Sequence, residues 1–498
     1  MLDGETVNVG DENTNTDPVT LGIEPGTVVK LNSSARIVVR DRINAQGTDT
    51  QRVVFTSYKD DSNAGDTNQD GAVTSSTEGD WDRIEIQSTS KASVFSYCTF
   101  MFGGANDLGM LRIDWADPTI DHCIFYASAS EGLRLENDAG PTVSECTFQS
   151  CAKGIRGTGS GSPEISDSLF SGNIECAIQF STMTKPVLQN LSASGRLAGV
   201  VIDKGVLSLS ATWSACGIPY ILNQTDLTVG GDEAAPEVTL TIEPGTVVKL
   251  SKNSRIIVHD RLHAVGEQGN RIVFTSLADD NALGDTNGDG TGSGEPGDWG
   301  RIEFTSGASS LSRMKHCRIQ YGGSYESDGV VENYGMVHVD GADITISDSI
   351  LEKCTDDALQ VTGSSNMTLS GCVVRNCSVG VKMLDSSSPT IDICTFDHAT
   401  YPITMRPSCS PSVTRSRAGN TQHAGILVRP GTVIQTAIWQ AGSLPYIIDG
   451  DVVQVGDGLT STAPIQLVLQ PGAVFKMSGG AQILVDDVLT AIGTVEQP

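Results

Sequence analysis

The sequence has no uninterrupted apolar stretch of about 18 residues, the length that a spanning helix requires, so we predict no membrane span in this segment. Positive charge is also scarce, because 32 Lys and Arg stand against 60 Asp and Glu, a formal net charge of −28. Nucleic acids are polyanions, so this balance argues against a nucleic-acid partner and favours divalent cations. Charged residues amount to only 18% beside 54 Gly and 19 Pro, which indicates many turns and few exposed amphipathic helices.

A long internal repeat is present. Residues 19–30 read VTLGIEPGTVVK and residues 238–249 read VTLTIEPGTVVK. The correspondence predicts one module at 1–219, a second at 220–445, and the start of a truncated third copy at 446–498 that continues the same solenoid. A copy that stops in mid-pattern, together with an opening without a signal peptide, favours a segment of a larger protein. An open last rung is an unpaired edge, so end-to-end self-association is a further expectation.

A shorter period runs inside each module. In the first, Cys98, Cys123, Cys146 and Ser168 follow one another at steps of 25, 23 and 22 residues. The second module repeats the series with Cys317, Ser349, Cys372 and Cys394. Short β-rich segments bounded by Gly, Ser, Asn or Asp lie between these positions, and no helical segment is available for a crossover. We therefore predict an all-β fold, a right-handed parallel β-helix with about 22–25 residues per rung.

The twelve cysteines mostly fall on this rung period, so we interpret them as buried free thiols that act as small apolar side chains. Two pairs repeat the same spacing, Cys146/Cys151 and Cys372/Cys377. A disulfide within these pairs stays an alternative, because the sequence does not fix connectivity.

Two acidic loops occupy the same position in the two modules. Each alternates Asp, Asn and Asp before a Gly, which places hard oxygen ligands on one side of a tight turn. The pattern matches the first half of an EF-hand loop but lacks its final Glu, so nearby aspartates would have to complete the shell. We predict structural Ca²⁺ sites there, with a solvated acidic turn as the alternative. The candidate ligands are Asp66, Asn68 and Asp70 in the first loop and Asp285, Asn287 and Asp289 in the second, with Asp60, Asp61, Asp80, Asp279, Asp280 and Asp298 as possible additions.

A column of arginines marks the first module. Arg112, Arg134 and Arg156 lie 22 residues apart, and Asp114 and Glu136 follow the first two at a distance of two residues. Equal phase on parallel rungs predicts vertical stacking on one exposed strip. The strip is either a ladder of ion pairs, a surface that holds an acidic sugar chain, or, third, a catalytic strip.

Trp115, beside this strip, is the one tryptophan placed to stack on a sugar ring, so Trp115, Arg112 and Arg134 are the candidate substrate-binding residues. The second module does not repeat the strip.

The run IEPGTVVKL, IVVRDRINAQGT, VVFTS, DTNQDG and GDW, followed by CTF rungs and a closing TW and GIPY, resembles the right-handed parallel β-helix modules of large secreted or surface bacterial proteins. These modules belong to the pectin-lyase-like superfamily, whose members include lyases, hydrolases and adhesive stalks. Asp356-Asp357 resembles the paired aspartates of β-helix galacturonan hydrolases. The companion Gly-His-Gly and Arg-x-Lys elements are missing, so we assign this pair no role.

We therefore expect a Ca²⁺-stabilised, non-enzymatic β-helical stalk or adhesive segment, extracellular or on the cell surface, with an extracellular polysaccharide or another surface protein as partner. The alternatives are a lyase or glycoside hydrolase acting on acidic glycans, and a non-catalytic carbohydrate-binding rod.

Overall fold

The computed structural model describes residues 1–11, 18–88, 90, 92–231, 236–327, 330–457 and 463–497. The chain packs into two compact units. Unit 1 consists of Met1–Lys204, Ser214–Ile221 and Leu283–Gly292. Unit 2 consists of Gly205–Trp213, Leu222–Ala282 and Ser293–Pro498. Residues 446–498 therefore pack with the second module, while the module boundaries themselves remain a prediction from the repeats.

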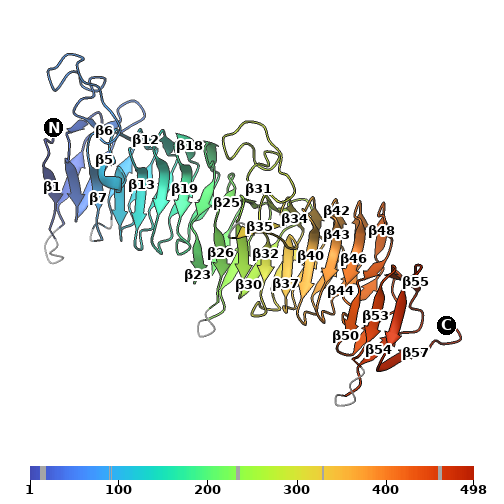
Figure 1. Cartoon of the computed structure of the whole chain (residues 1–498). Coiled ribbons are helices and arrows are strands. Elements are labelled where there is room, and N and C mark those ends of the chain that lie inside the picture. The colour runs from blue at the N-terminus through green and yellow to red at the C-terminus, as the bar shows by residue number, and fades with distance from the viewer. Residues whose placement is uncertain are drawn as a thin grey trace. The chain divides into compact units, whose positions relative to one another are not determined.

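Unit 1 is a stack of rungs with three short strands each. One rung consists of β10 (Leu111–Asp114), β11 (Thr119–Asp121) and β12 (Ile124–Tyr126). The chain then enters β13 (Glu131–Glu136), which pairs with β10 in parallel, with Leu133 opposite Leu111. Figure 1 shows these strands as successive rungs. The 22-residue step between the two leucines confirms the predicted parallel β-helix and its period.

Stacked phenylalanines fill one side of this interior. They come from β6 (Val53–Ser57), β9 (Cys98–Met101), β12, β15 (Thr147–Gln149) and β18 (Leu169–Asn173). Parallel, in-register strands place equal positions above one another, so the rings stack with centroids 4.7–5.1 Å apart. The fully buried members are Phe55, Phe100, Phe125, Phe148 and Phe170. This column gives unit 1 a continuous apolar core.

A one-residue corner recurs on five successive rungs of unit 1, just before the cysteine column. The residue at this corner has a left-handed backbone, with φ between 48° and 53° at Tyr97, His122, Glu145, Asp167 and Asn190. The side chain after the corner turns inward, as Cys98, Cys123 and Cys146 do. His122 and His316 occupy this corner, where a positive φ marks the bend rather than a chemical site.

The cysteines follow the prediction with one correction. Ten are free and buried. Cys377, however, is bonded to Cys354, 23 residues earlier, and not to Cys372. The reason is stacking: residues one rung apart lie directly above one another, with Cα atoms 5.2 Å apart in this pair. The other predicted pair, Cys146 and Cys151, is not bonded.

Unit 2 repeats the coil. A representative rung consists of β40 (Asp357–Thr362), β41 (Thr368–Ser370) and β42 (Val373–Arg375). The next rung starts with β43 (Val379–Met383), and β46 (Tyr401–Met405) and β49 (Ile426–Val428) extend the same parallel sheet.

The longest excursions leave the coil at the corner between the strand after the cysteine corner and the first strand of the next rung. In unit 1 this corner carries the first acidic loop, between β6 and β7 (Arg83–Ile86), and a 3-10 turn at Ala105–Asp107. In unit 2 it carries an antiparallel hairpin of β35 (Ser324–Ser327) and β36 (Val330–Asn333). The hairpin accounts for extra length in the second module.

Candidate functional site

The first acidic loop brings three carboxylates together. Oxygen atoms of Asp61, Asp66 and Asp70 all lie within 4.8 Å of one another. Backbone N–H groups hold the loop closed, because Gly71 donates to Asp66 at 2.9 Å and Asp70 donates to the same side chain at 3.3 Å. Two ligands on opposite faces of a Ca²⁺ ion are about 4.6–5.2 Å apart, so the spacing fits this ion.

Three oxygens of this loop are buried without a hydrogen-bond donor among the described residues: Oδ1 of Asp61, Asn68 and Asp70. The amide of Asn68 is oriented by its nitrogen, which donates to Asp70 Oδ2 at 2.8 Å and to Thr74 Oγ1 at 2.9 Å. Its oxygen is therefore left as an acceptor. Buried acceptors without a donor are costly, and a cation would satisfy all three together.

Two of the additional candidates, Asp60 and Asp80, lie outside this group and close the base of the loop. Asp60 accepts hydrogen bonds from Thr56 at 2.6 Å and from the Ser62 backbone at 3.0 Å. Burial opposes ionisation of Asp60, but hydrogen bonds from Ser62 and Thr56 outweigh it and lower its pKa. Asp80 pairs with Lys59 at 2.8 Å, and this bond likewise lowers its pKa against the effect of burial.

In the second loop, too, some aspartates form an acidic group and others close the base of the loop. Asp285 accepts from the backbone N–H groups of Gly288 at 2.7 Å and Gly290 at 3.0 Å, and it lies in the corresponding acidic group with Asp289. Asn287 donates to Asp289 at 2.6 Å. Asp280 is the sequence counterpart of Asp61.

Asp279 and Asp298 serve the base of the second loop. Asp279 accepts from Thr275 at 2.6 Å and from Gln320 at 2.8 Å. Asp298 accepts from Ser276 at 2.6 Å.

The arginine column of unit 1 stacks as its phase predicts. Arg112 lies opposite Arg134, and Arg134 lies opposite Arg156, on β10, β13 and β16 (Lys153–Gly157). Arg112 also lies opposite Glu85 of β7, while Asp114 lies opposite Glu136. Carboxylates are thus interleaved with the guanidinium groups along the strip.

These carboxylates pair with the first two guanidinium groups of the column. Arg112 contacts Glu85 at 2.9 Å and also bonds to Glu136. Arg134 donates to Glu136 at 2.6 Å. Burial raises the pKa of Glu136, but its bonds to Arg112 and Arg134 outweigh this and lower it.

Arg156 completes the column through a two-pronged pair with Asp203 at 3.0 and 2.7 Å. All three arginines are therefore held by the protein's own acids, an arrangement that favours the ion-pair ladder. Trp115 is 56% exposed at the edge of the strip.

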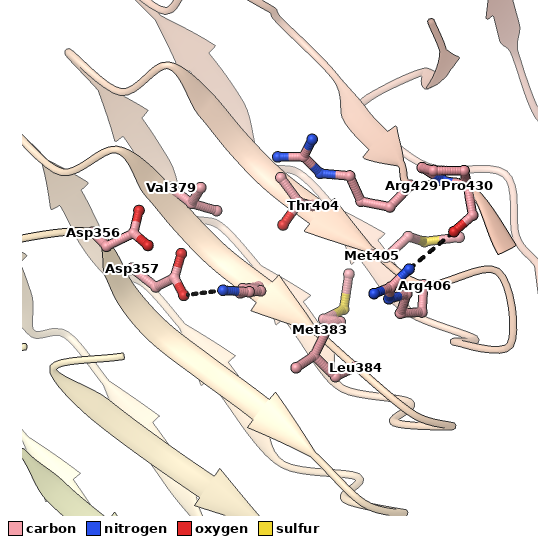
Figure 2. A pocket seen from close by; sticks show the side chains of 11 residues that line it. Asp356, Asp357, Val379, Met383, Leu384, Thr404, Met405, Arg406, Arg429 and Pro430 are labelled. Carbon is pink, nitrogen blue, oxygen red and sulfur yellow. Dashed lines mark hydrogen bonds and ion pairs between the residues drawn. The ribbon is translucent and has the colours of Figure 1, made fainter. Parts of the chain in front are cut away.

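A pocket of about 400 Å³ opens in unit 2, on the outer face of β40, β43 and β46. Figure 2 shows Asp356 and Asp357 on one side of it and Arg406 and Arg429 on the other. Lys382 lies on β43, the strand between β40 and β46, and bonds to Asp357 Oδ2 at 2.9 Å. The remaining lining residues are Val379, Met383, Leu384, Thr404, Met405 and Pro430.

Asp357 is the unusual group of this pocket. Its side chain is 1% exposed, and its Oδ1 has no hydrogen-bond donor within the described part of the chain. Burial raises the pKa of Asp357, and the bond to Lys382 offsets only part of that effect. Sequence reasoning noticed the adjacent aspartates but not the pocket, because its cations, Arg406 and Arg429, come from two later rungs.

The family model described as "Right handed beta helix region" matches residues 82–213 and 302–438, more than half of the chain. The chain therefore belongs to the right-handed β-helix family, which confirms the predicted pectin-lyase-like fold. Among the curated proteins compared with the chain, none matches. No helix in the described residues is long and apolar enough to cross a membrane.

One solved structure, the catalytic domain of a GH87 alpha-1,3-glucanase variant in complex with tetrasaccharides, is similar with a TM-score of 0.23 and 10% identity. The match covers 84% of this chain and 64% of that chain, so the present chain spans less than two thirds of it.

Proposed function

We propose that this chain is a Ca²⁺-stabilised, non-enzymatic β-helical segment of an extracellular or cell-surface protein, which serves as a stalk or adhesive surface. The observation that carries the proposal is the group of three buried, donorless oxygens of Asp61, Asn68 and Asp70, beside the third carboxylate of Asp66. In the metal-bound state these residues would hold the ion and pin the long loop to the coil. Extracellular calcium modules bind at about 10⁻⁴–10⁻³ M, and such sites fill only where Ca²⁺ is abundant.

The two modules do not carry the same polar side chains in their corresponding outer columns, and this difference supports the non-enzymatic part of the proposal. The arginines of the first module are neutralised by carboxylates of the same sheet, and the second module has His338, Gln360 and Lys382 along the corresponding column. A duplicated catalytic module would place equivalent side chains in both copies. A structural ladder needs only local charge balance on each rung.

Calcium should raise the melting temperature of the protein, because millimolar Ca²⁺, at about ten times the lower of these Kd values, stabilises the folded state by about 1.4 kcal/mol per site. The experiment compares thermal unfolding in EDTA and in millimolar Ca²⁺ for the wild type, for the double variant Asp66→Asn/Asp70→Asn, and for Asp49→Asn, an exposed matched control.

The double variant should lose the part of the Ca²⁺ response that the first loop contributes and retain the part that the second loop contributes. In EDTA it should be at least as stable as the wild type, because two repelling charges are gone. Asp49→Asn should retain the full response. An unchanged melting temperature in the wild type on adding Ca²⁺ would contradict the metal assignment.

Incubation with acidic and neutral polysaccharides in Ca²⁺ should produce no unsaturated products and no new reducing ends. The reason is that every arginine of the predicted strip is already bonded to a carboxylate. Turnover that Arg112→Ala/Arg134→Ala abolishes would instead place an active site on the first module and overturn the structural proposal.

A further inference from the structure

The pocket of unit 2 lies at a position where the two modules carry side chains of opposite charge. Lys382 of the second module corresponds to Arg156 of the first. Arg156 lies opposite Gln179 on the next rung, and Lys382 lies opposite Thr404, so Thr404 corresponds to Gln179. On the rung after that, matching backbone hydrogen bonds show which residues of the two modules correspond. Asp203 N–H donates to Phe180 C=O at 2.9 Å, and Arg429 N–H donates to Met405 C=O at 2.9 Å. Arg429 therefore stands where the first module has Asp203.

This charge reversal changes the local pairing. In the first module, Asp203 accepts two bonds from Arg156 and one from Gln179 at 2.7 Å, so the surface there is closed. In the second module the residue at the position of Asp203 is Arg429, whose positive charge repels Lys382. Lys382 turns to Asp357 instead.

The shorter side chain at Thr404 leaves space where Gln179 reaches across the first module. The space beside Thr404 therefore follows from this difference in side-chain length.

The two sides of the pocket offer complementary groups. On one side, Arg429 has no carboxylate within ion-pair distance among the residues that the structure describes, and Arg406 donates one bond to the Pro430 carbonyl at 2.9 Å. On the other side, Asp357 Oδ1 is buried without a donor, and Asp356 lies beside it. A ligand that fits must carry an anionic group for the guanidinium side and a hydrogen-bond donor for the carboxylate side.

We propose that this pocket binds a small hydroxycarboxylate, that is, an organic acid with hydroxyl groups beside its carboxylate, such as a sugar acid. Guanidinium groups bind carboxylates through paired hydrogen bonds, so Arg429 is the anchor for the acid group. A ligand hydroxyl donating to Asp357 Oδ1 would satisfy the buried acceptor. A volume of about 400 Å³ lies near the lower end of small-molecule sites, as a single sugar-sized unit requires. The proposal goes beyond the Ca²⁺-stabilised scaffold and does not depend on it.

Calorimetric titration of the whole chain in Ca²⁺ tests the proposal with three probes. Glucuronate carries both groups, glucose lacks the acid, and acetate lacks the hydroxyls. Glucuronate should bind about tenfold or more tightly than either control compound, because each lost interaction with a charged group is worth about tenfold to a hundredfold. Equal binding of glucuronate and acetate, or no binding of glucuronate, would overturn the proposal.

Variants locate the site. Arg429→Asp restores the charge that the first module carries at this position and should reduce glucuronate affinity about tenfold or more. Thr404→Gln, which restores the larger side chain, should weaken binding without any change of charge. Arg417→Asp, an exposed control in the same unit, should bind as the wild type does. Circular dichroism checks that each variant is folded, and unaltered affinity in both folded pocket variants would contradict the assignment.

A fourth probe separates two sources of the same chemistry. An oligosaccharide that ends in glucuronate should bind more tightly than the monomer if the natural ligand is the end of an acidic glycan. Binding equal to that of the monomer would identify the free acid. Failure of an oligosaccharide to bind where the monomer binds would likewise favour the free acid.

Discussion

Replacing Phe148 by alanine should lower the free energy of unfolding by about 3–5 kcal/mol, the usual cost of removing a buried phenylalanine ring. Phe148 is stacked between Phe125 at 4.7 Å and Phe170 at 5.0 Å and is fully buried. The cavity would lie in the middle of a column, where rungs above and below hold the walls apart. Collapse around it is therefore limited, which places the expected cost in the upper part of the range.

Urea unfolding followed by far-ultraviolet circular dichroism measures this loss. Leu169→Ala is the matched control, because Leu169 sits next to Phe170 on β18 but is 42% exposed. The control should change stability by well under half of the Phe148→Ala effect. Similar losses in both variants would show that the ring column is not the main apolar core of unit 1.

Gly159→Ala should destabilise the protein by about 3 kcal/mol or more, at the high end of what overpacking costs. Gly159 lies in the turn after β16, where a Cβ atom would stand 1.5 Å from the carbonyl oxygen of Asn137 on the rung below. The obstacle is backbone, which cannot rotate aside as a flexible side chain can. The two rungs would have to separate, and the hydrogen bonds between them would lengthen.

Gly22→Ala provides the comparison, since nothing lies within 4 Å of its added Cβ and its backbone needs no positive φ. It should be neutral or slightly stabilising, because alanine restricts the unfolded chain. Thermal unfolding of the two variants in Ca²⁺ gives the result directly. A Gly159→Ala variant as stable as Gly22→Ala would mean that adjacent rungs have more freedom than their close packing implies.

The fold could be predicted from the sequence because equivalent residues recur at the spacing of one rung. Cys98, Cys123 and Cys146 keep one phase, and parallel strands turn equal phase into vertical stacking. The same logic predicted the stacking of Arg112 on Arg134. It did not predict which carboxylate each arginine binds, since partners such as Glu85 come from a strand that the 22-residue spacing does not include.

The sites were less accessible to sequence reasoning for a geometric reason. Adjacent aspartates diverge: Asp60 turns to the loop base while Asp61 turns to the acidic group, and no pattern of letters separates them. The disulfide between Cys354 and Cys377 joins rungs, whereas the predicted alternative joined residues five apart. The pocket depends on Arg429, which the sequence marks only when it is compared with Asp203 in the other module.

The corner that carries the longest excursions is a place where loops of different length can be accommodated. On five rungs of unit 1 the corner before the cysteine column turns on a single left-handed residue, whereas the corner after the next strand accommodates the acidic loops and the β35–β36 hairpin. Each rung pairs mainly with its neighbours, so a longer loop on one leaves the ladders of the others intact. This corner can therefore gain or lose loops without disturbing the coil, so new recognition surfaces can be added there one rung at a time.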